Sequence, residues 1–386
     1  MNRPPYKEGV FVYNWLIFYF NRLPLAAENL NDMKVHNFSA GPGILPQEVL
    51  KKASEACIDF NGMGLSLLEI SHRGKNVIAV FDRAAELVRK LLGIDDQYEV
   101  LFLQGGASTQ FAMVPANFLY GKAAYLNTGV WASKAIKEAG LYGDTVVVAS
   151  SENQKFNHIP KDYIVPFDAD YFHITSNNTI YGTQMRKFPE SPVPLFCDMS
   201  SDIFSHQFDA TKFSLIYAGV QKNMGPAGAT MVILKKDLLE KITRKIPSMF
   251  NYKIHAEGES MYNTPPVFAV YVSMLTLEWL DSNGGVAWAE KRNEAKAKLF
   301  YDELDRNSQF TGTVVPEDRS WMNANFVLNH PEKEKYFSDM IKEANIVGLN
   351  GHRSVGGFRA SMYNAMDIDS VQVLVDVMKE FEQKFA

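Results

Sequence analysis

The run from Tyr217 to Gly228 reads YAGVQKNMGPAG and places one lysine, Lys222, among glycines. An apolar stretch from Phe213 to Tyr217 precedes it and predicts a short buried strand. Glycines that follow such a strand let the backbone approach closely whatever the lysine faces. This setting is unusual for a lysine, because most lysines are solvated charges on the surface.

A second apolar run upstream, Leu195 to Ser201, reads LFCDMSS and predicts another short strand. It ends in Asp198 and hydroxyl groups, among them Ser200. An aspartate before two serines is usually a cap or a turn residue. An acid and a lysine at neighbouring strand ends, however, suit pyridoxal phosphate, since the lysine can hold its aldehyde as a Schiff base and the acid can keep its pyridine nitrogen protonated.

The overall composition is that of an ordinary globular protein, with 386 residues, 46% of them hydrophobic, and a net charge of −5. This length allows two domains and a large core. The absence of a basic run in the sequence argues against nucleic acid as a partner. Cys57 and Cys197 lack metal-ligand spacing, so we expect no metal site and no disulfide scaffold. A reducing, cytoplasmic compartment fits this cysteine usage best.

The first 32 residues differ from the rest. The stretch from Val10 to Phe20 is very aromatic but too short to span a bilayer, so we expect no membrane span. It imitates a weak signal peptide. Met33 directly precedes the first sequence that is typical of the predicted enzyme. We therefore expect residues 1–32 to be an extension outside the fold that arises from a start assigned too far upstream, and an interfacial anchor is the alternative.

From residue 47 onward, helical patterns alternate with short apolar strands. This order predicts an α/β fold in which a mostly parallel sheet is sandwiched by helices, followed by a smaller C-terminal α+β domain. We assign residues 47–290 to the large domain, and residues 33–46 with 291–386 to the small one. Ligands of such sheets bind at the carboxyl ends of the strands. The predicted helices are 47–60, 75–92, 266 to near 284, 286–306, 332–345 and 368–385. The predicted strands are 99–103, 123–127, 145–149, 171–175, 195–198, 215–218, 230–234, 311–315 and 323–328.

Two further motifs follow predicted strands. The run from Gln104 to Gln110, QGGASTQ, opens a helix and could offer backbone N–H groups to a phosphate, although most such turns are ordinary tight turns. Trp131 also comes just after a strand end, where its ring could stack on a flat cofactor. A tryptophan in the core is the more common alternative.

Three arginines lie on glycine-bounded loops, and two of them follow a histidine directly. The guanidinium group matches carboxylate and phosphate geometrically, so these loops suggest a doubly anionic substrate. Surface salt bridges are the alternative for each arginine alone. Asn263 and Thr264 open a predicted helix, where Thr264 is a plausible cap. The residues of the arginine loops are His72, Arg73, His352, Arg353 and Arg359.

With these motifs in view, the chain resembles the phosphoserine aminotransferases, which are class V aminotransferases of fold type I and use pyridoxal 5'-phosphate. The resemblance runs from about Asn37 to the C-terminus. It rests on five motifs in the family's order: NFSAGP (37–42), EISHRGK (69–75), YAGVQKNMGPAG (217–228), MYNTPP (261–266) and GHRSVGGFRAS (351–361). Some relatives have Gly-Arg at the positions of Ala107 and Ser108, and others have serine in place of Ala40.

The resemblance implies roles for the candidate residues. Lys222 would attach to the cofactor and Asp198 would pair with the pyridine nitrogen, while Trp131 would stack on the ring. Thr179 would meet the phenolic oxygen side, and Arg359 would bind the α-carboxylate of the substrate. The remaining cofactor contacts would come from Ala107, Ser108, Ser200, Gln221 and, across a homodimer interface, from Asn263 and Thr264. The substrate phosphate or the distal carboxylate of glutamate would be bound by His72, Arg73, His352 and Arg353.

The implied reaction is transamination between glutamate and 3-phosphohydroxypyruvate, giving phosphoserine and 2-oxoglutarate for serine biosynthesis. A related phosphorylated substrate of pyridoxine biosynthesis stays open. Two alternatives compete with this interpretation. A cysteine desulfurase would need a mobile nucleophilic cysteine, which neither Cys57 in a helix nor Cys197 in a strand provides. A non-catalytic protein that binds a phosphorylated ligand would not need Lys222 and Asp198 together.

Overall fold

A seven-stranded sheet forms the centre of the large domain in the computed structural model, which describes residues 34–353 and 355–385. All helices and strands in that part of the chain belong to one compact unit that begins at His36. The expectation for residues 1–32 lies outside the described residues. The strands follow the order β2 (Tyr98–Leu103), β8 (Thr230–Lys235), β7 (Leu215–Gly219), β6 (Leu195–Asp198), β5 (Phe172–Thr175), β3 (Lys122–Asn127) and β4 (Asp144–Ser150).

The sheet is mostly parallel, as predicted. Strands β7, β6, β5, β3 and β4 pair in parallel, whereas β8 runs antiparallel to both of its neighbours. In the register, Asp198 at the end of β6 lies opposite Thr175 at the end of β5 and opposite Tyr217 in β7. The carboxyl ends of the parallel strands therefore meet at one edge, where loops can form a ligand site.

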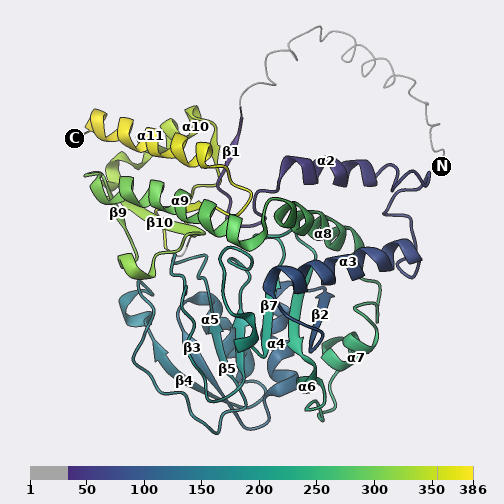
Figure 1. Ribbon diagram of the computed structural model, residues 1–386. Helices are drawn as coiled ribbons and strands as arrows, with labels where there is room; N and C mark the ends of the chain where they lie inside the picture. Colours follow the sequence, from purple (N-terminus) through teal and green to yellow (C-terminus); the bar gives the residue numbers. More distant parts are fainter. Residues whose placement is uncertain (1–33, 354, 386) are drawn as a thin grey trace, which may run out of the picture. The chain divides into compact units, whose positions relative to one another are not determined.

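Helices cover both faces of this sheet (Figure 1). Alternate strand residues point to opposite faces. On one face, Phe102 packs edge-on against Phe81 of α3 (Lys75–Leu92); on the other, Tyr217 packs edge-on against Phe111 of α4 (Gly106–Phe118). The first face is covered by α3 and α8 (Val267–Ser282), and α2 (Gln47–Ala56) packs against α8. The second is covered by α4, α5 (Val130–Ala139), α6 (Lys236–Leu239) and α7 (Tyr252–Glu257).

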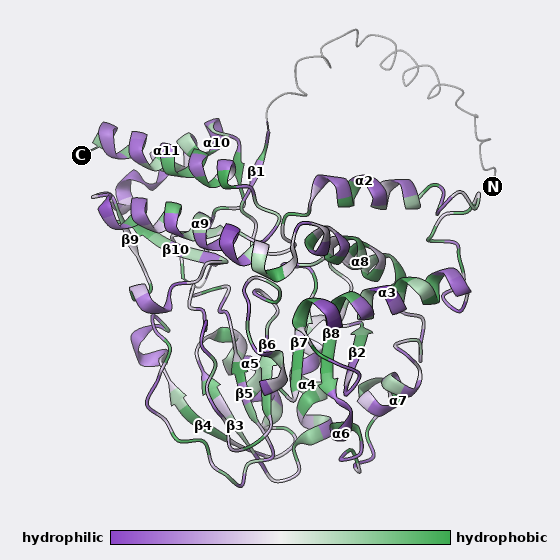
Figure 2. Ribbon diagram, in the orientation of Figure 1, coloured by the Kyte–Doolittle hydropathy of each residue, from purple (hydrophilic) through white to green (hydrophobic). Residues whose placement is uncertain are grey.

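A smaller domain with a second core follows. Its antiparallel sheet has the order β12 (Phe358–Ser361), β10 (Asn323–Leu328) and β9 (Phe310–Gly312), and β1 (His36–Asn37) pairs in parallel with β11 (Ile346–Val347). Its helices are α9 (Gly285–Arg306), α10 (Glu334–Glu343) and α11 (Ile368–Phe385). Figure 2 shows apolar strands at the centre of the large sheet and polar residues along α9 and α11.

The domain division that we propose cuts through α9. Val286 and Ala289 in its first turns pack in the core of the large domain, whereas Phe300 and Leu304 pack in the core of the small one. The pairing of β1 with β11 supports the assignment of the residues before α2 to the small domain.

Three local predictions were wrong in detail. The helix predicted over 47–60 ends at Ala56, and the chain continues into turns in which Asn61 and Gly62 both have positive φ. The strand predicted over 311–315 ends at Gly312, since the amide of Val315 bonds to a carbonyl elsewhere in the fold. Thr264 does not cap α8: the helix starts at Val267 without a side-chain cap. Within the described residues, no helix combines the length and the apolar character needed to cross a bilayer.

Candidate active site

A cavity of about 120 Å³ lies at the carboxyl ends of the parallel strands. Its wall also contains three residues without a predicted role, Thr175, Asn177 and Ser201, of which Thr175 ends a strand and Ser201 belongs to the LFCDMSS run. The structure brings eight predicted cofactor contacts together here. They are Ala107, Ser108, Trp131, Thr179, Asp198, Ser200, Gln221 and Lys222.

Lys222 reaches this cavity from the loop after β7. Its Nζ atom donates a hydrogen bond to Thr179 Oγ1 over 3.3 Å. Burial and, to a smaller extent, the positive charge of Arg359 lower the pKa of Lys222 to about 8, against the opposing effect of Asp198. A lysine with this pKa has a neutral amine available near pH 8, as a nucleophile or a general base requires.

The NFSAGP motif and the glycine that follows it pack against Lys222. A Cβ atom on Gly41, which has a φ of +151°, would lie 2.9 Å from Lys222 Cδ, and one on Gly43 would lie 2.5 Å from the Lys222 carbonyl oxygen. The amide of Gly43 donates to the carbonyl of Gln221 over 2.7 Å. The hydroxyl of Tyr363 donates to the carbonyl of Ala40 over 2.6 Å. The segment is therefore held directly against the lysine.

Asp198 is a buried carboxylate, 4% exposed, in the same wall. Its Oδ1 atom accepts hydrogen bonds from the amide and the hydroxyl of Ser200 over 2.9 and 2.6 Å. Burial raises the pKa of Asp198, while these hydrogen bonds and the charge of Lys222 lower it. A cationic N–H group in the cavity would stabilise the ionised form, because buried charges are costly unless they are paired.

The first turn of α4, which lies in the cavity wall, is suited to an anion. Gly105 and Gly106 have φ values of +99° and +68°, and no side chain caps the helix. A Cβ atom on Gly105 would lie 2.2 Å from Thr109 Oγ1, so the turn requires glycine. The N–H groups at the start of α4, beside Ala107 and Ser108, are therefore available to a phosphate, and the helix dipole favours a negative charge there.

Trp131 lies in the cavity wall, and Arg359 contacts a residue of that wall, Thr179. Trp131 lies in the first turn of α5, lines the cavity and contacts the ring of Phe111, with 6.4 Å between centroids. Arg359, in β12, donates from Nη1 to the carbonyl of Thr179 over 3.1 Å. Its buried Nε atom has no hydrogen-bond partner, and burial lowers its pKa. An incoming carboxylate would supply that partner.

His352 and Arg353 lie in the loop before β12. Burial lowers the pKa of His352, and the charges of Arg359, Arg353 and Lys134 lower it further. No negative charge is among these causes. The loop is therefore positive and suits the second anionic group of a substrate.

The cavity wall includes neither Arg359, His352 and Arg353 nor the four other predicted contacts. Asn263 and Thr264 contact Gln104 instead: the amide of Gln104 donates to the Thr264 carbonyl over 2.9 Å. His72 and Arg73 lie in the turn before α3. The contribution of Asn263 and Thr264 across a dimer interface, which the resemblance implies, stays a prediction.

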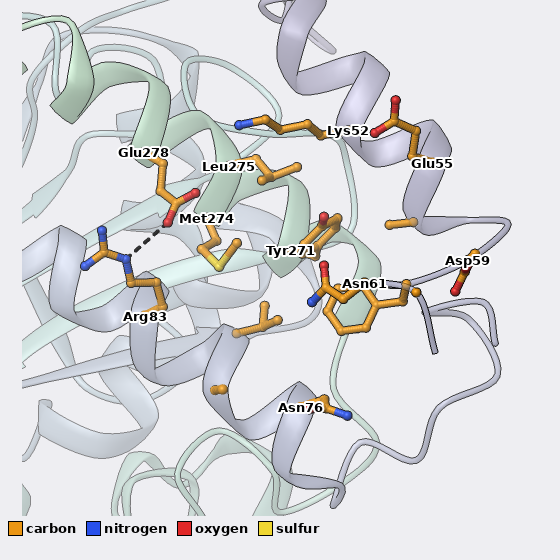
Figure 3. A pocket seen from close by; sticks show the side chains of 15 residues that line it. Lys52, Glu55, Asp59, Asn61, Asn76, Arg83, Tyr271, Met274, Leu275 and Glu278 are labelled. Carbon is orange, nitrogen blue, oxygen red and sulfur yellow. Dashed lines mark hydrogen bonds and ion pairs between the residues drawn. The ribbon is translucent and has the colours of Figure 1, made fainter. Parts of the chain in front are cut away.

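A larger hollow of about 620 Å³ lies between α2, α3 and α8 (Figure 3). Its wall includes Lys52, Asn76 and Tyr271, and Arg83 pairs with Glu278 over 3.2 Å. It contains none of the predicted site residues. The cavity with Lys222 is therefore the better candidate, although it is smaller. In the described part of the chain, no cluster of His, Cys, Asp or Glu could hold a metal ion.

The residues 35–374 match the family described as class-V aminotransferases. The chain belongs to the class V aminotransferase family. It is 60% identical over 355 residues to the phosphoserine aminotransferase of Flavobacterium psychrophilum, covering 91% of this chain and 100% of the relative. The solved phosphoserine aminotransferase of Bacillus circulans subsp. alkalophilus superposes with a TM-score of 0.89 at 45% identity, covering 92% of this chain and 99% of that one.

A PLP-bound phosphoserine aminotransferase from Trichomonas vaginalis superposes with a TM-score of 0.86 at 36% identity. That alignment covers 90% of this chain and all of the other. The family, the fold and the aminotransferase activity predicted from the motifs are thereby confirmed. The roles of individual residues stay predictions.

Proposed function

We propose that this aminotransferase exchanges amino groups between glutamate and 3-phosphohydroxypyruvate, giving phosphoserine and 2-oxoglutarate. The observation that carries the proposal is the presence of Lys222, Asp198 and the uncapped start of α4 in the wall of one cavity. The relatives at 54–60% identity, which are phosphoserine aminotransferases, support this choice of substrate.

Pyridoxal phosphate is the cofactor that these residues fit. The first turn of α4 would hold its phosphate, Asp198 its pyridine nitrogen and Trp131 its ring, and Lys222 would attach to its aldehyde. Thr175 Oγ1, a buried atom of the cavity wall without a hydrogen-bond partner, could also bond to a ligand there. When bound, the cofactor supplies an electron sink for the substrate carbon that loses a proton.

The protein groups have separate tasks in this reaction. The amine of Lys222, with its lowered pKa, moves the proton at the substrate α-carbon. The carboxylate of Asp198 would stabilise a positive charge on the pyridine nitrogen of the cofactor. Arg359 orients the α-carboxylate through the guanidinium edge that lacks a partner. The segment around Gly41 packs on the lysine side chain and restricts where its amine can move.

We further propose a homodimer in which each cavity is completed by the second subunit. The support is that Asn263, Thr264, His72 and Arg73 do not line the cavity of their own protomer, although the resemblance implies that they contact cofactor or substrate. The two free cysteines, Cys57 and Cys197, support a reducing compartment, which we propose to be the cytoplasm.

The cysteine desulfurase alternative fits the structure poorly. Cys197 is buried in β6, and burial raises its pKa well above the ordinary value, as do the charges of Asp202 and Asp198. Cys57 ends α2 outside the cavity wall. Neither thiol can serve as a mobile nucleophile at Lys222.

A coupled assay tests the proposed substrate. The purified enzyme should consume 3-phosphohydroxypyruvate with glutamate in a ping-pong pattern, because the two substrates use one site in alternation. The related phosphorylated four-carbon keto acid of pyridoxine synthesis is the comparison substrate. If neither keto acid accepts an amino group while cysteine releases sulfur, the proposed substrate is wrong.

A further inference from the structure

Lys134 lies next to the candidate site but has no role in the reaction described so far. It follows Trp131 by three residues on α5, a spacing that places both side chains on one face of the helix. Its Nζ atom lies 4.4 Å from the centroid of the Trp131 ring. Because Trp131 lines the cavity with Lys222, this contact holds the ammonium group of Lys134 beside the cavity wall.

The charge of Lys134 is not neutralised by a neighbour. In the described part of the chain, no carboxylate forms an ion pair with it. The cation–π contact orders the side chain without cancelling its charge. An ordered cation without a counter-ion is suited to an anionic ligand.

Lys134 also belongs to the positive field around the loop before β12. Its charge acts on His352 together with those of Arg353 and Arg359. These charges converge from α5 in the large domain and from the β12 region in the small domain. Arg359 donates to the carbonyl of Thr179, and the hydroxyl of the same threonine accepts from Lys222. Among these cations, Arg359 is therefore the one that we assign to the α-carboxylate of the substrate.

We propose that Lys134 is a substrate-binding residue that recognises the distal phosphate of the substrate, from the opposite domain to His352 and Arg353. This inference rests on the proposed function. A phosphate carries more negative charge than a carboxylate and is bound well by the compact charge of an ammonium group. Lys134 would thereby favour the phosphorylated substrate over an amino acid or keto acid that lacks a phosphate.

Three variants separate this role from others. Lys134→Met removes the charge and keeps most of the apolar stem, and Lys134→Arg keeps the charge. Lys137→Met is the matched control, because Lys137 is exposed on the same helix one turn further along. All three changes are at exposed positions, so the holoenzyme should fold normally.

The test measures equilibrium binding of 3-phosphoglycerate to the holoenzyme, since this molecule has the carboxylate and the phosphate but no reactive keto or amino group. D-glycerate, which lacks the phosphate, is the comparison ligand. Lys134→Met should weaken 3-phosphoglycerate binding about three- to tenfold, the scale of one charge-assisted contact at a partly exposed site. Binding of D-glycerate should stay within about twofold, and Lys134→Arg and Lys137→Met should resemble the wild type.

The outcomes distinguish two kinds of failure. If the wild-type enzyme transaminates 3-phosphohydroxypyruvate but Lys134→Met binds 3-phosphoglycerate as tightly as Lys137→Met does, only the role of Lys134 is refuted. An equal loss of D-glycerate binding also refutes it, because the lysine would then act through Trp131 and not on the phosphate. If the wild type neither binds 3-phosphoglycerate nor uses the phosphorylated keto acid, the proposed function itself fails.

Discussion

Lys222 and Arg359 meet at a single residue, Thr179. The amine of Lys222 donates to its hydroxyl over 3.3 Å, and the guanidinium of Arg359 donates to its backbone carbonyl over 3.1 Å. One residue thus links the predicted attachment point of the cofactor to the predicted ligand of the substrate carboxylate. The positive charge of Arg359 also lowers the pKa of Lys222. With Arg359 as the ligand of the substrate carboxylate, as we propose, substrate binding and the reactivity of the lysine would be coupled.

Arg359→Gln should raise the pKa of Lys222 above its value of about 8, because one of the two causes that lower it is removed. Only the neutral amine can attach to an aldehyde, so the pH midpoint for cofactor attachment to the apoenzyme should move to higher pH. Binding of both substrates should weaken by roughly 10- to 100-fold, the scale of a hydrogen bond to a charged group.

Stopped-flow absorbance of the apoenzyme mixed with cofactor measures that midpoint. Arg83→Gln is the control, because Arg83 lies in an exposed ion pair in the hollow of Figure 3, away from the cavity. A midpoint that is the same in Arg359→Gln, Arg83→Gln and the wild type would show that the two side chains are not coupled.

Gly41→Ala should lower turnover strongly, because the new Cβ atom would lie 2.9 Å from Lys222 Cδ and the lysine would have to move. Gly64→Ala is the matched control: Gly64 also has a positive φ, but nothing lies within 4 Å of the added atom. Both changes should cost about 1 kcal/mol or somewhat more in the free energy of unfolding. A thermal melt with steady-state kinetics separates the effects, and equal turnover in the two variants would contradict the packing role of Gly41.

Asp198→Asn should leave the cofactor attached but reduce turnover by about 10²- to 10³-fold, the scale found when a preorganised electrostatic contact is removed. A neutral amide cannot hold a positive charge on the ring nitrogen. Ser200→Ala, which removes a 2.6 Å hydrogen bond but keeps the carboxylate, should cost far less. Single-turnover kinetics with glutamate measures the effect of both substitutions. Near-normal turnover of Asp198→Asn would contradict the role assigned to Asp198.

The sequence predicted best what depends on local pattern. Helix α3 has the predicted bounds, Lys75–Leu92, because its apolar face repeats at helical spacing and Gly93 ends it in the left-handed conformation. Asp198 and Lys222 could be paired because the first ends one buried strand and the second follows its neighbour in the same sheet.

Features that depend on contacts between residues far apart in the sequence could not be predicted from local patterns. The need for glycine at position 41 comes from a side chain far away in the sequence. The short strand β9 ends at Gly312, and beyond it the amide of Val315 bonds to the carbonyl of Asn157. His72 and Arg73 lie outside the cavity wall of their own protomer, and no pattern within one chain indicates where a second subunit would place them. The role that we propose for Lys134 was not predicted, because an exposed lysine on a helix has no distinguishing signal in the sequence.

The central claim is that Lys222 is the lysine to which the cofactor attaches, and one measurement tests it directly. Borohydride reduction of the purified holoenzyme fixes the pyridoxyl group on its lysine, and peptide mass spectrometry then locates it. The account predicts a single modified site at Lys222, and no covalent attachment in Lys222→Ala. A pyridoxyl group on any other lysine, or none in an active enzyme, would contradict the account.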